Sequence, residues 1–286
     1  MPDIERLRAG HRRGVAALMR AALEPTWRLA PDVVERFPAG FLAVEPDDEL
    51  SGFVAVDPGG TVPLIVVAPH RQRSGVGSAL LSTAAAELRA TGVDRIRAGA
   101  GGGVWPGVPL DLPGAVAFFT RRGWTVEHDT LDLTCDLRGY RPPPGIGQRL
   151  AAAGVQLAPA GPADAYPLID AYFPSWSTFY RRNRAGVLAA RDAAGTVVGA
   201  LLFDGPDAPT VFAPMLGARA ATIGCVGVAP RVQGLGIGTA MVAHASAILA
   251  GRGCRVCHIG WAVREAFYVR AGYRPWRRYR IFERTA

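Results

Sequence analysis

The second half of the chain contains the stretch Val226-Gly-Val-Ala-Pro-Arg-Val-Gln-Gly-Leu-Gly-Ile-Gly-Thr-Ala240, which decides the fold. An apolar run leads into a glycine-rich turn and then into apolar residues at helical spacing, which predicts a strand, a turn and a helix. The first amides of a helix lack intrahelical partners and lie at its positive end, so the turn is predicted to bind an anion. Glycines let a ligand approach the backbone closely, which favours a pyrophosphate; a plain strand-to-helix turn is the alternative.

The first half contains a second copy of this stretch. Residues 65–79 align with residues 226–240 at a constant offset of 161, and Val67, Pro69, Gln72, Gly75 and Gly77 match Val228, Pro230, Gln233, Gly236 and Gly238. Further on, Ala-Phe-Phe-Thr-Arg-Arg-Gly-Trp at 117–124 aligns with Ala-Phe-Tyr-Val-Arg-Ala-Gly-Tyr at 266–273, at an offset of 149. This internal repeat predicts a duplicated domain.

The length of 286 residues suits two domains of roughly 140 residues better than one. The expected boundary is Arg141-Pro-Pro-Pro-Gly145, because consecutive prolines sustain neither a helix nor a central strand. We therefore expect an N-terminal domain over residues 1–140, a proline-rich linker over 141–153 and a C-terminal domain over 154–286.

Both halves predict the same α/β order of elements. Strands are expected at residues 5–8, 41–45, 52–57 and 62–67 of the first half, and at 155–157, 187–191, 197–203 and 222–228 of the second. Helices are expected at residues 12–23, 75–90, 163–172 and 236–249. The strand before each glycine turn is almost entirely apolar, as expected of a strand that is buried on both faces.

The composition excludes several classes of enzyme. All 32 residues counted as lysine plus arginine are arginine, and they exceed the 24 acids to give a net charge of +8. A chain without lysine has no Schiff-base amine, no attachment point for pyridoxal phosphate and no Walker lysine. Aldolases, transaminases and P-loop kinases are therefore excluded. Apolar residues at 49% and charged residues at 20% indicate a globular protein.

The chain shows neither a secretory leader nor an apolar run of the roughly 18 residues that a membrane span needs, so a cytoplasmic location is expected. Its four cysteines are too few for a disulfide framework and are expected to be reduced. The pair Cys254 and Cys257 has zinc-knuckle spacing but lacks a second pair, so no metal is expected.

A dinucleotide-binding fold is the rival for glycine spacing of this kind. It requires a third glycine where Thr239, Ala240 and Met241 stand, and an acid on a following strand. Neither requirement is met, so the rival is set aside.

The pattern Gln-x-x-Gly-x-Gly after a Val-x-Pro strand end, followed later by Phe-Tyr-x-x-x-Gly-Tyr, resembles the GNAT acyltransferases, which are related to the Gcn5 histone acetyltransferases. The resemblance spans both halves, so the chain is similar to a tandem GNAT protein. It implies two α/β domains, each a mixed sheet splayed between its fourth and fifth strands and flanked by helices. Acetyl-CoA, or another acyl-CoA, is the implied co-substrate.

The resemblance also implies site residues in each half. In the second half, the pantetheine arm would pair with the backbone of Val226 and Val228, and the pyrophosphate would lie on Gln233, Gly234, Gly236, Gly238 and Thr239. The equivalent positions of the first half are Gln72, Arg73, Gly75, Gly77 and Ser78.

Acyl transfer from a thioester needs an attacking amine, donors for the oxyanion and a proton for the departing thiolate. A tyrosine near the start of the last helix supplies this proton in the family, which implies Tyr268 as general acid; a core aromatic residue is the alternative. The first half has Phe119 there, which has no proton to donate. The C-terminal domain is therefore expected to be catalytic and the N-terminal domain non-catalytic.

The sequence shows no clear general base. His258 lies on the strand that follows the glycine-turn helix, where a core histidine is the alternative to a base. Cys225 lies on the strand before the turn and is expected to be an unreactive buried thiol. Neither residue is assigned to catalysis.

Two further segments have alternative interpretations. Residues 99–113 hold a twelve-residue excess over the second half, either as a rigid surface loop or as a lid in which Trp105 and Asp111 meet a cationic acceptor. Near the end of the chain, a strand would place Arg278 and Arg280 on one face with aromatic rings. Such a face can contact nucleic acid; a solvated terminal hairpin is the alternative.

Three functions remain open. The first is acyl-CoA-dependent N-acyl transfer to a small-molecule amine, with Tyr268 as general acid. The second is transfer from aminoacyl-tRNA, and the third is acyl-CoA binding without reaction. No membrane partner is expected. A monomer is favoured over a homodimer, because a tandem chain can pair its own terminal strands.

Overall fold

The computed structural model describes residues 2–100, 104–182, 186–208 and 210–285. They form two compact units that are interleaved along the chain. Unit 1 comprises Met1–Leu131, Val211–Met215 and Arg277–Ala286, and unit 2 comprises Asp132–Thr210 and Leu216–Trp276.

The sheet of unit 1 has the strand order β1-β2-β3-β4-β5-β13. The bounds are β1 (Asp3–Arg6), β2 (Gly40–Val44), β3 (Leu50–Asp57), β4 (Thr61–Val67), β5 (Arg95–Ala98) and β13 (Arg274–Thr285), with the short β6 (Val108–Pro109) also on β13. The strands β1 to β4 are antiparallel neighbours. The parallel pair β4 and β5 is joined only at Thr61↔Arg97 and Val62↔Ala98, so the two strands separate toward the glycine turn.

Helices cover this sheet at α1 (Arg12–Leu23), α2 (Val76–Ala90) and α3 (Pro113–Thr120). The apolar residues of α2 recur at helical spacing, and Leu80, Ala84 and Leu88 are almost completely buried. They belong to a core with residues of β2 to β5, Phe119 of α3 and Phe282 of β13. The apolar residues that recur at helical spacing in α2 thus face the sheet, as the sequence predicts.

Unit 2 repeats this architecture with the strand order β7-β12-β11-β10-β9-β8. The bounds are β7 (Thr125–Asp136), β8 (Gln156–Ala160), β9 (Gly186–Arg191), β10 (Val197–Asp204), β11 (Ala220–Val228) and β12 (Val256–Ala262). Its helices are α4 (Ile146–Ala152), α5 (Pro162–Tyr172), α6 (Ser177–Arg182), α8 (Ile237–Gly251) and α9 (Glu265–Val269), and the short α7 (Ala213–Leu216) spans the boundary between the units. The parallel strands β11 and β12 pair from Ala220↔Val256 to Thr222↔His258 and then separate.

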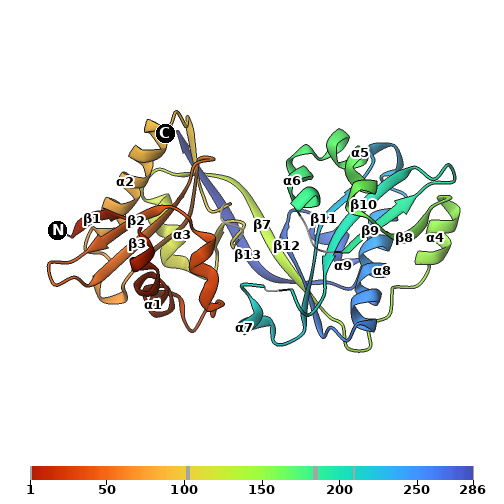
Figure 1. The fold of residues 1–286 in the computed structure, drawn as a ribbon, viewed down its shortest axis with the longest axis horizontal. Coiled ribbons are helices and arrows are strands. Elements are labelled where there is room, and N and C mark those ends of the chain that lie inside the picture. Colours follow the sequence, from red (N-terminus) through yellow and green to blue (C-terminus); the bar gives the residue numbers. More distant parts are fainter. Residues whose placement is uncertain (1, 101–103, 183–185, 209, 286) are drawn as a thin grey trace. The chain divides into compact units, whose positions relative to one another are not determined.

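The two halves exchange their last strands. The C-terminal part of β7, which ends the first half, belongs to unit 2. The C-terminal part of β13 pairs antiparallel with β5 of unit 1, from Phe282↔Ala98 to Thr285↔Arg95, and ends among the red and orange elements of that unit (Figure 1). The compact units therefore differ from the contiguous ranges 1–140 and 154–286, and α4 forms a helix inside the expected linker.

Cys135, Cys225, Cys254 and Cys257 are free thiols. No group of three or more metal-ligating side chains occurs among the described residues. Within the same residues, no helix is both long and apolar enough to cross a bilayer.

Candidate active site

The glycine turn of unit 2 connects β11 to α8. Gln233 closes its base, because its side-chain amide donates a hydrogen bond of 2.9 Å to the carbonyl oxygen of Val228. Gly234 and Gly236 have φ values of +83° and +79°, a conformation that costs a side-chain-bearing residue energy. In the described part of the chain, no acceptor takes a hydrogen bond from the backbone amides of residues 234–239. The predicted anion cradle is therefore open.

The strand β11 contains a β-bulge just before this turn. Gly227 pairs with Ala200 and Gly224 with Leu202, so Cys225 and Val226 both lie opposite Leu201. Cys225 has a φ of +49°, which is rare for a residue with a side chain. Tyr180 of α6, which is fully buried, donates a hydrogen bond of 2.9 Å to the carbonyl oxygen of Cys225. Because a trans peptide is planar, this bond also fixes the direction of the Val226 N–H.

The predicted acid Tyr268 lies on α9 and is half-buried. The neighbouring Phe267 packs over Gly238, where an added Cβ would lie 2.9 Å from its ring. Burial, with a smaller contribution from Cys225, raises the pKa of Tyr268 to about 12. The phenol is therefore protonated at neutral pH, and no described residue hydrogen-bonds its hydroxyl.

The thiol of Cys225 is not activated. Burial raises its pKa to about 12, so it is protonated at neutral pH. Its side chain packs against the core formed by α5, α6 and β10, which also contains Tyr180. The expectation of an unreactive thiol agrees with this environment.

His258 has a partner that the sequence did not indicate. Its Nε2 atom lies 3.1 Å from Oδ2 of Asp132, which belongs to β7. Asp132 is completely buried, and His258 is 7% exposed. Oδ1 of Asp132 accepts a hydrogen bond of 3.0 Å from the backbone N–H of Trp261. The carboxylate therefore contacts two residues of β12.

The glycine turn of unit 1 has the same backbone but a different interior. Gln72 donates to the carbonyl oxygen of Val67 at 3.3 Å, as Gln233 does to Val228. The amide of Ser78, however, donates to the carbonyl oxygen of Gly75 at 3.0 Å. The guanidinium group of Arg122 donates a short hydrogen bond to the Ser78 hydroxyl. Part of this cradle is therefore occupied by the protein itself.

Arg122 lies over the ring of Phe118, with its guanidinium carbon 3.8 Å from the ring centroid. Burial, followed by the charge of Arg121, lowers the pKa of Arg122. The equivalent position in unit 2 is Ala271, which is fully buried and carries no charge. The cradle of unit 1 therefore has an arginine side chain at a position where unit 2 has only the methyl group of an alanine.

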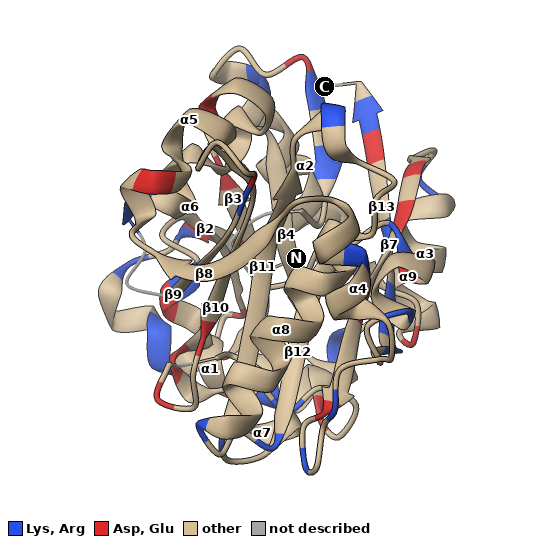
Figure 2. Cartoon of the chain, turned by 90° about the vertical axis from the view of Figure 1, so that its right-hand side faces the viewer, with Lys and Arg blue, Asp and Glu red and all other residues tan. Residues whose placement is uncertain are grey.

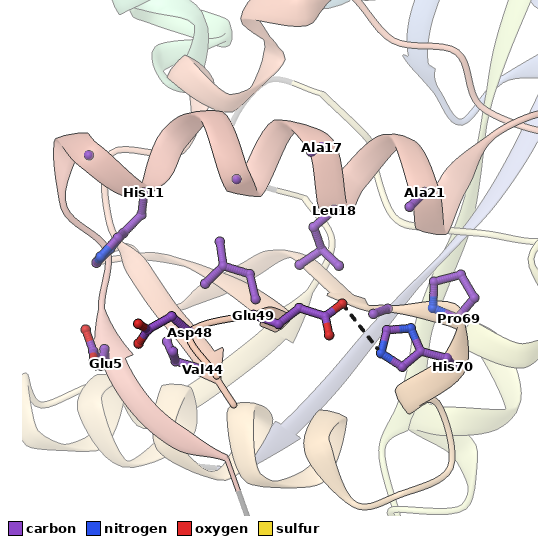
Figure 3. Close-up of a pocket in the computed structure, with 14 residues that line it drawn as sticks. Glu5, His11, Ala17, Leu18, Ala21, Val44, Asp48, Glu49, Pro69 and His70 are labelled. Carbon is purple, nitrogen blue, oxygen red and sulfur yellow. Dashed lines mark ion pairs between the residues drawn. The ribbon is translucent and has the colours of Figure 1, made fainter. Parts of the chain in front are cut away.

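Unit 1 contains a pocket of about 770 Å³ between α1 and the β2–β3 turn (Figure 3). His70 lies 3.6 Å from Glu49 at one end of it, and His11 and Glu5 lie at the other. None of the predicted site residues of unit 1 lines this pocket. In unit 2 the position equivalent to His70 is Arg231, which forms an ion pair of 2.9 Å with Asp192.

The loop with the twelve-residue excess packs inside unit 1. Trp105 is 3% exposed and meets Trp27 edge-on at 5.6 Å. Asp111 accepts a hydrogen bond from the indole N–H of Trp27 and forms a short ion pair with Arg277. The lid interpretation is therefore wrong for Trp105 and Asp111, because burial and pairing occupy both side chains. Residues 101–103 of the loop lie outside the described residues.

The basic strand β13 belongs to unit 1 from Arg277 onward. Tyr279 and Phe282 are completely buried, and Arg280 forms a bidentate pair with Asp129 at 2.7 and 2.8 Å. Figure 2 shows acidic and basic residues along this same strand. Tyr279 and Phe282 therefore belong to the core, whereas Trp276 is half-buried and Arg278 is exposed. Contact with nucleic acid stays a prediction.

Two splayed sheets, each with a glycine turn between a buried strand and a helix, define an acyltransferase fold in tandem. The model of the acetyltransferase (GNAT) family matches the chain twice, at residues 12–124 and 156–273. The chain belongs to this family and carries two of its domains.

Among known proteins, the mycothiol acetyltransferase of Cellulomonas flavigena is 29% identical over 232 residues, which cover 72% of this chain and 62% of that protein. A GCN5-related glucosamine N-acetyltransferase region of a fungal multi-domain GH3 β-N-acetylglucosaminidase is 26% identical, with a TM-score of 0.91 over 99% of this chain and 38% of that one. A tandem GNAT protein from the clavulanic acid biosynthesis pathway has the same fold at 19% identity and a TM-score of 0.64, covering 99% of this chain and 98% of that one. The chain thus spans less than two thirds of the first two relatives.

Proposed function

We propose that unit 2 transfers an acetyl group from acetyl-CoA to the amine of a small molecule, and that this amine belongs to an amino sugar. The family supports acetyl transfer. One relative supports the acceptor class, since it is named a glucosamine N-acetyltransferase region. The other, a mycothiol acetyltransferase, supports acetyl transfer.

The residues of unit 2 fit the co-substrate. The open amides of residues 234–239 lie at the positive end of α8 and suit the pyrophosphate of acetyl-CoA. Val226 and Val228 lie on the part of β11 that has separated from β12, where their backbone groups can pair with the pantetheine arm. The N–H of Val226, fixed through Tyr180, is a suitable donor toward the thioester oxygen.

Tyr268 acts as the general acid in this proposal. Its raised pKa keeps the phenolic proton in place at neutral pH, ready for the departing thiolate. Unit 1 has Phe119 at the same position, completely packed between Trp124 and Phe282. Turnover is therefore assigned to unit 2 alone.

The observation that carries the proposal is the combination of an open cradle and a protonated phenol in one unit. Neither feature is complete in unit 1, where Ser78 is bonded and the phenol is missing. The intramolecular exchange of β7 and β13 supports a monomer, because it pairs the terminal strands within one chain.

The test is release of free thiol from acetyl-CoA by the full chain in the presence of glucosamine, compared with a panel of other amines and with aminoacyl-tRNA as the donor. Acetylation of glucosamine, confirmed by mass spectrometry of the product, is expected. If no amine in the panel causes thiol release, acetyl transfer is contradicted. Release with non-sugar amines alone would contradict the acceptor class.

A further inference from the structure

The buried pair of Asp132 and His258 is not used by the proposed function as stated above. The two residues are 126 positions apart in sequence and meet because β7 of the first half lies in the sheet of unit 2. A buried pair of polar or charged side chains gives little net stability compared with a well-packed apolar pair, so stability alone is a weak reason for its presence. The pair therefore suggests a chemical role.

His258 lies where the sheet opens. It pairs with Thr222 in the last parallel pair before β11 and β12 separate. Side chains of directly paired residues point to the same face, and residues two apart on a strand share that face. The next residue of β11 on this face is Gly224, where an added Cβ would meet nothing within 4 Å. The sheet face that carries the imidazole is therefore open at Gly224, next to the point where the strands separate.

Asp132 restrains the histidine from the exchanged strand. Oδ2 faces Nε2 of His258 at 3.1 Å, while Oδ1 accepts the N–H of Trp261, whose φ is +61°. Gly260 leaves room for the pair, since an added Cβ would lie 3.2 Å from both Oδ1 of Asp132 and Cε1 of His258. The edge of the imidazole also meets the ring of Trp276 at 5.4 Å.

We propose that His258 is the catalytic residue that accepts the proton of the acceptor's ammonium group, and that Asp132 is its positioning residue. This inference rests on the proposed function of unit 2. A neutral imidazole can take the proton, and the carboxylate beside it stabilises the imidazolium that results.

The proton balance is complete. The ammonium group gives one proton to His258 and becomes a neutral amine. Its nitrogen forms a bond to the thioester carbonyl carbon, and the carbon–sulfur bond breaks. The sulfur takes the proton of Tyr268, and the second proton lost by the nitrogen restores that phenol. His258 releases its proton to solvent, so the products are an acetamide, a free thiol and one proton.

The decisive variant is His258→Gln, measured with acetyl-CoA and glucosamine in the full chain. At pH 7 we expect kcat/KM for glucosamine to fall about 100-fold, within the usual range for loss of a general base. At a pH above the pKa of the glucosamine ammonium group, the amine is already neutral and the loss should shrink to less than about 5-fold. The KM for acetyl-CoA should stay the same.

Asp132→Asn is the second variant, because it keeps the imidazole. A loss of about 10-fold at pH 7 with the same recovery at high pH is expected, in line with the effect of outer partners on a reactive group. Asp129→Asn is the matched control: it lies on the same strand and breaks an ion pair with Arg280 in unit 1. It should leave kcat/KM unchanged.

Native turnover by His258→Gln at pH 7, or a deficit of equal size at both pH values, overturns the role of His258. If His258→Gln does not fold, Asp132→Asn decides in the same way: native activity or a pH-independent loss overturns the proposal. No turnover by the unmodified protein with any amine instead overturns the proposed function. The two failures are therefore distinguishable.

Discussion

The two glycine turns of the molecule have the same backbone and different surroundings. Both begin after a buried strand, both are closed by a glutamine that donates to a strand carbonyl, and both lead into a 15-residue helix. In unit 2 the described residues leave the amides open, and α9 carries the phenol of Tyr268. In unit 1 the guanidinium group of Arg122 donates a hydrogen bond to the serine hydroxyl of the turn, and Phe119 stands where unit 2 has the phenol.

The strands before the turns differ as well. The irregularity in β11 falls at Cys225 and Val226, next to the turn, whereas that in β4 falls between the Leu64 and Thr61 pairings, at the opposite end of the strand. A duplicated domain can thus keep its backbone fold while losing the polar groups needed for activity. The frame depends on glycines and apolar packing, whereas activity depends on a few polar groups.

The largest expected effect comes from Tyr268→Phe. Loss of the proton donor should lower kcat by about 100-fold or more with little change in the KM for acetyl-CoA. The matched control in unit 1 is Phe119→Leu, which should leave kcat unchanged. Steady-state thiol release measures both, and native turnover by Tyr268→Phe would move catalysis away from unit 2.

Gly238→Val tests how the cradle positions α9. An added Cβ would lie 2.9 Å from Phe267, so the larger side chain must displace the ring beside Tyr268. We expect kcat to fall about 10-fold, because small displacements of a reacting group are costly. In unit 1, Gly77→Val meets Phe118 at 3.2 Å in the same way and should not change kcat. Equal losses in the two variants would contradict the difference between the units.

The buried thiol of Cys257 makes the stability of unit 2 sensitive to alkali. Burial raises its pKa, so the folded thiol keeps its proton at pH values where the unfolded thiol, with a pKa near 8.5, loses it. The stabilisation is complete below pH 8 and declines as the pH rises. Between pH 9.5 and 10.5 the unfolding free energy falls as the pH rises. In Cys257→Ala this fall should be smaller by about 1.4 kcal/mol per pH unit.

Urea denaturation at several pH values measures this slope, and the variant's own stability at pH 7 provides the reference. An unchanged slope would mean that Cys257 titrates in the folded protein as it does in the unfolded chain.

The smallest effect is expected for Arg122→Ala in unit 1. Because Ser78 already has partners for its amide and hydroxyl, we expect the native chain to bind one acetyl-CoA, in unit 2. The variant should leave the Kd of that site within about 2-fold, because a tenfold change would require about 1.4 kcal/mol of binding free energy. Calorimetry gives both values. Two sites in the native chain would show that the cradle of unit 1 still binds.

Most of the frame could be predicted from local sequence patterns. The helix expected at residues 12–23 is α1 itself, and those expected at 75–90 and 236–249 differ from α2 and α8 by one or two residues at their ends. Apolar periodicity and glycine positions are local signals, and they determine where such elements begin and end. The repeat then gave the family, which the match at residues 12–124 and 156–273 confirms.

The exchange of strands and the pair of Asp132 with His258 could not be predicted in this way. Both depend on which strand lies beside β12, and a strand's own alternation does not name its neighbour. The position of the bulge at Cys225 is likewise set by pairing with Leu201. The roles of Tyr268 and the cradle residues stay predictions that the kinetic experiments decide.

The path of β13 has a consequence for any attempt to divide the molecule. Severing the chain in its run of prolines would leave each fragment holding a strand that completes the other fragment's sheet. We expect either piece alone to expose an apolar edge and to aggregate. Mixed during refolding, the two pieces should reassemble, so that regained thiol release would report their complementation.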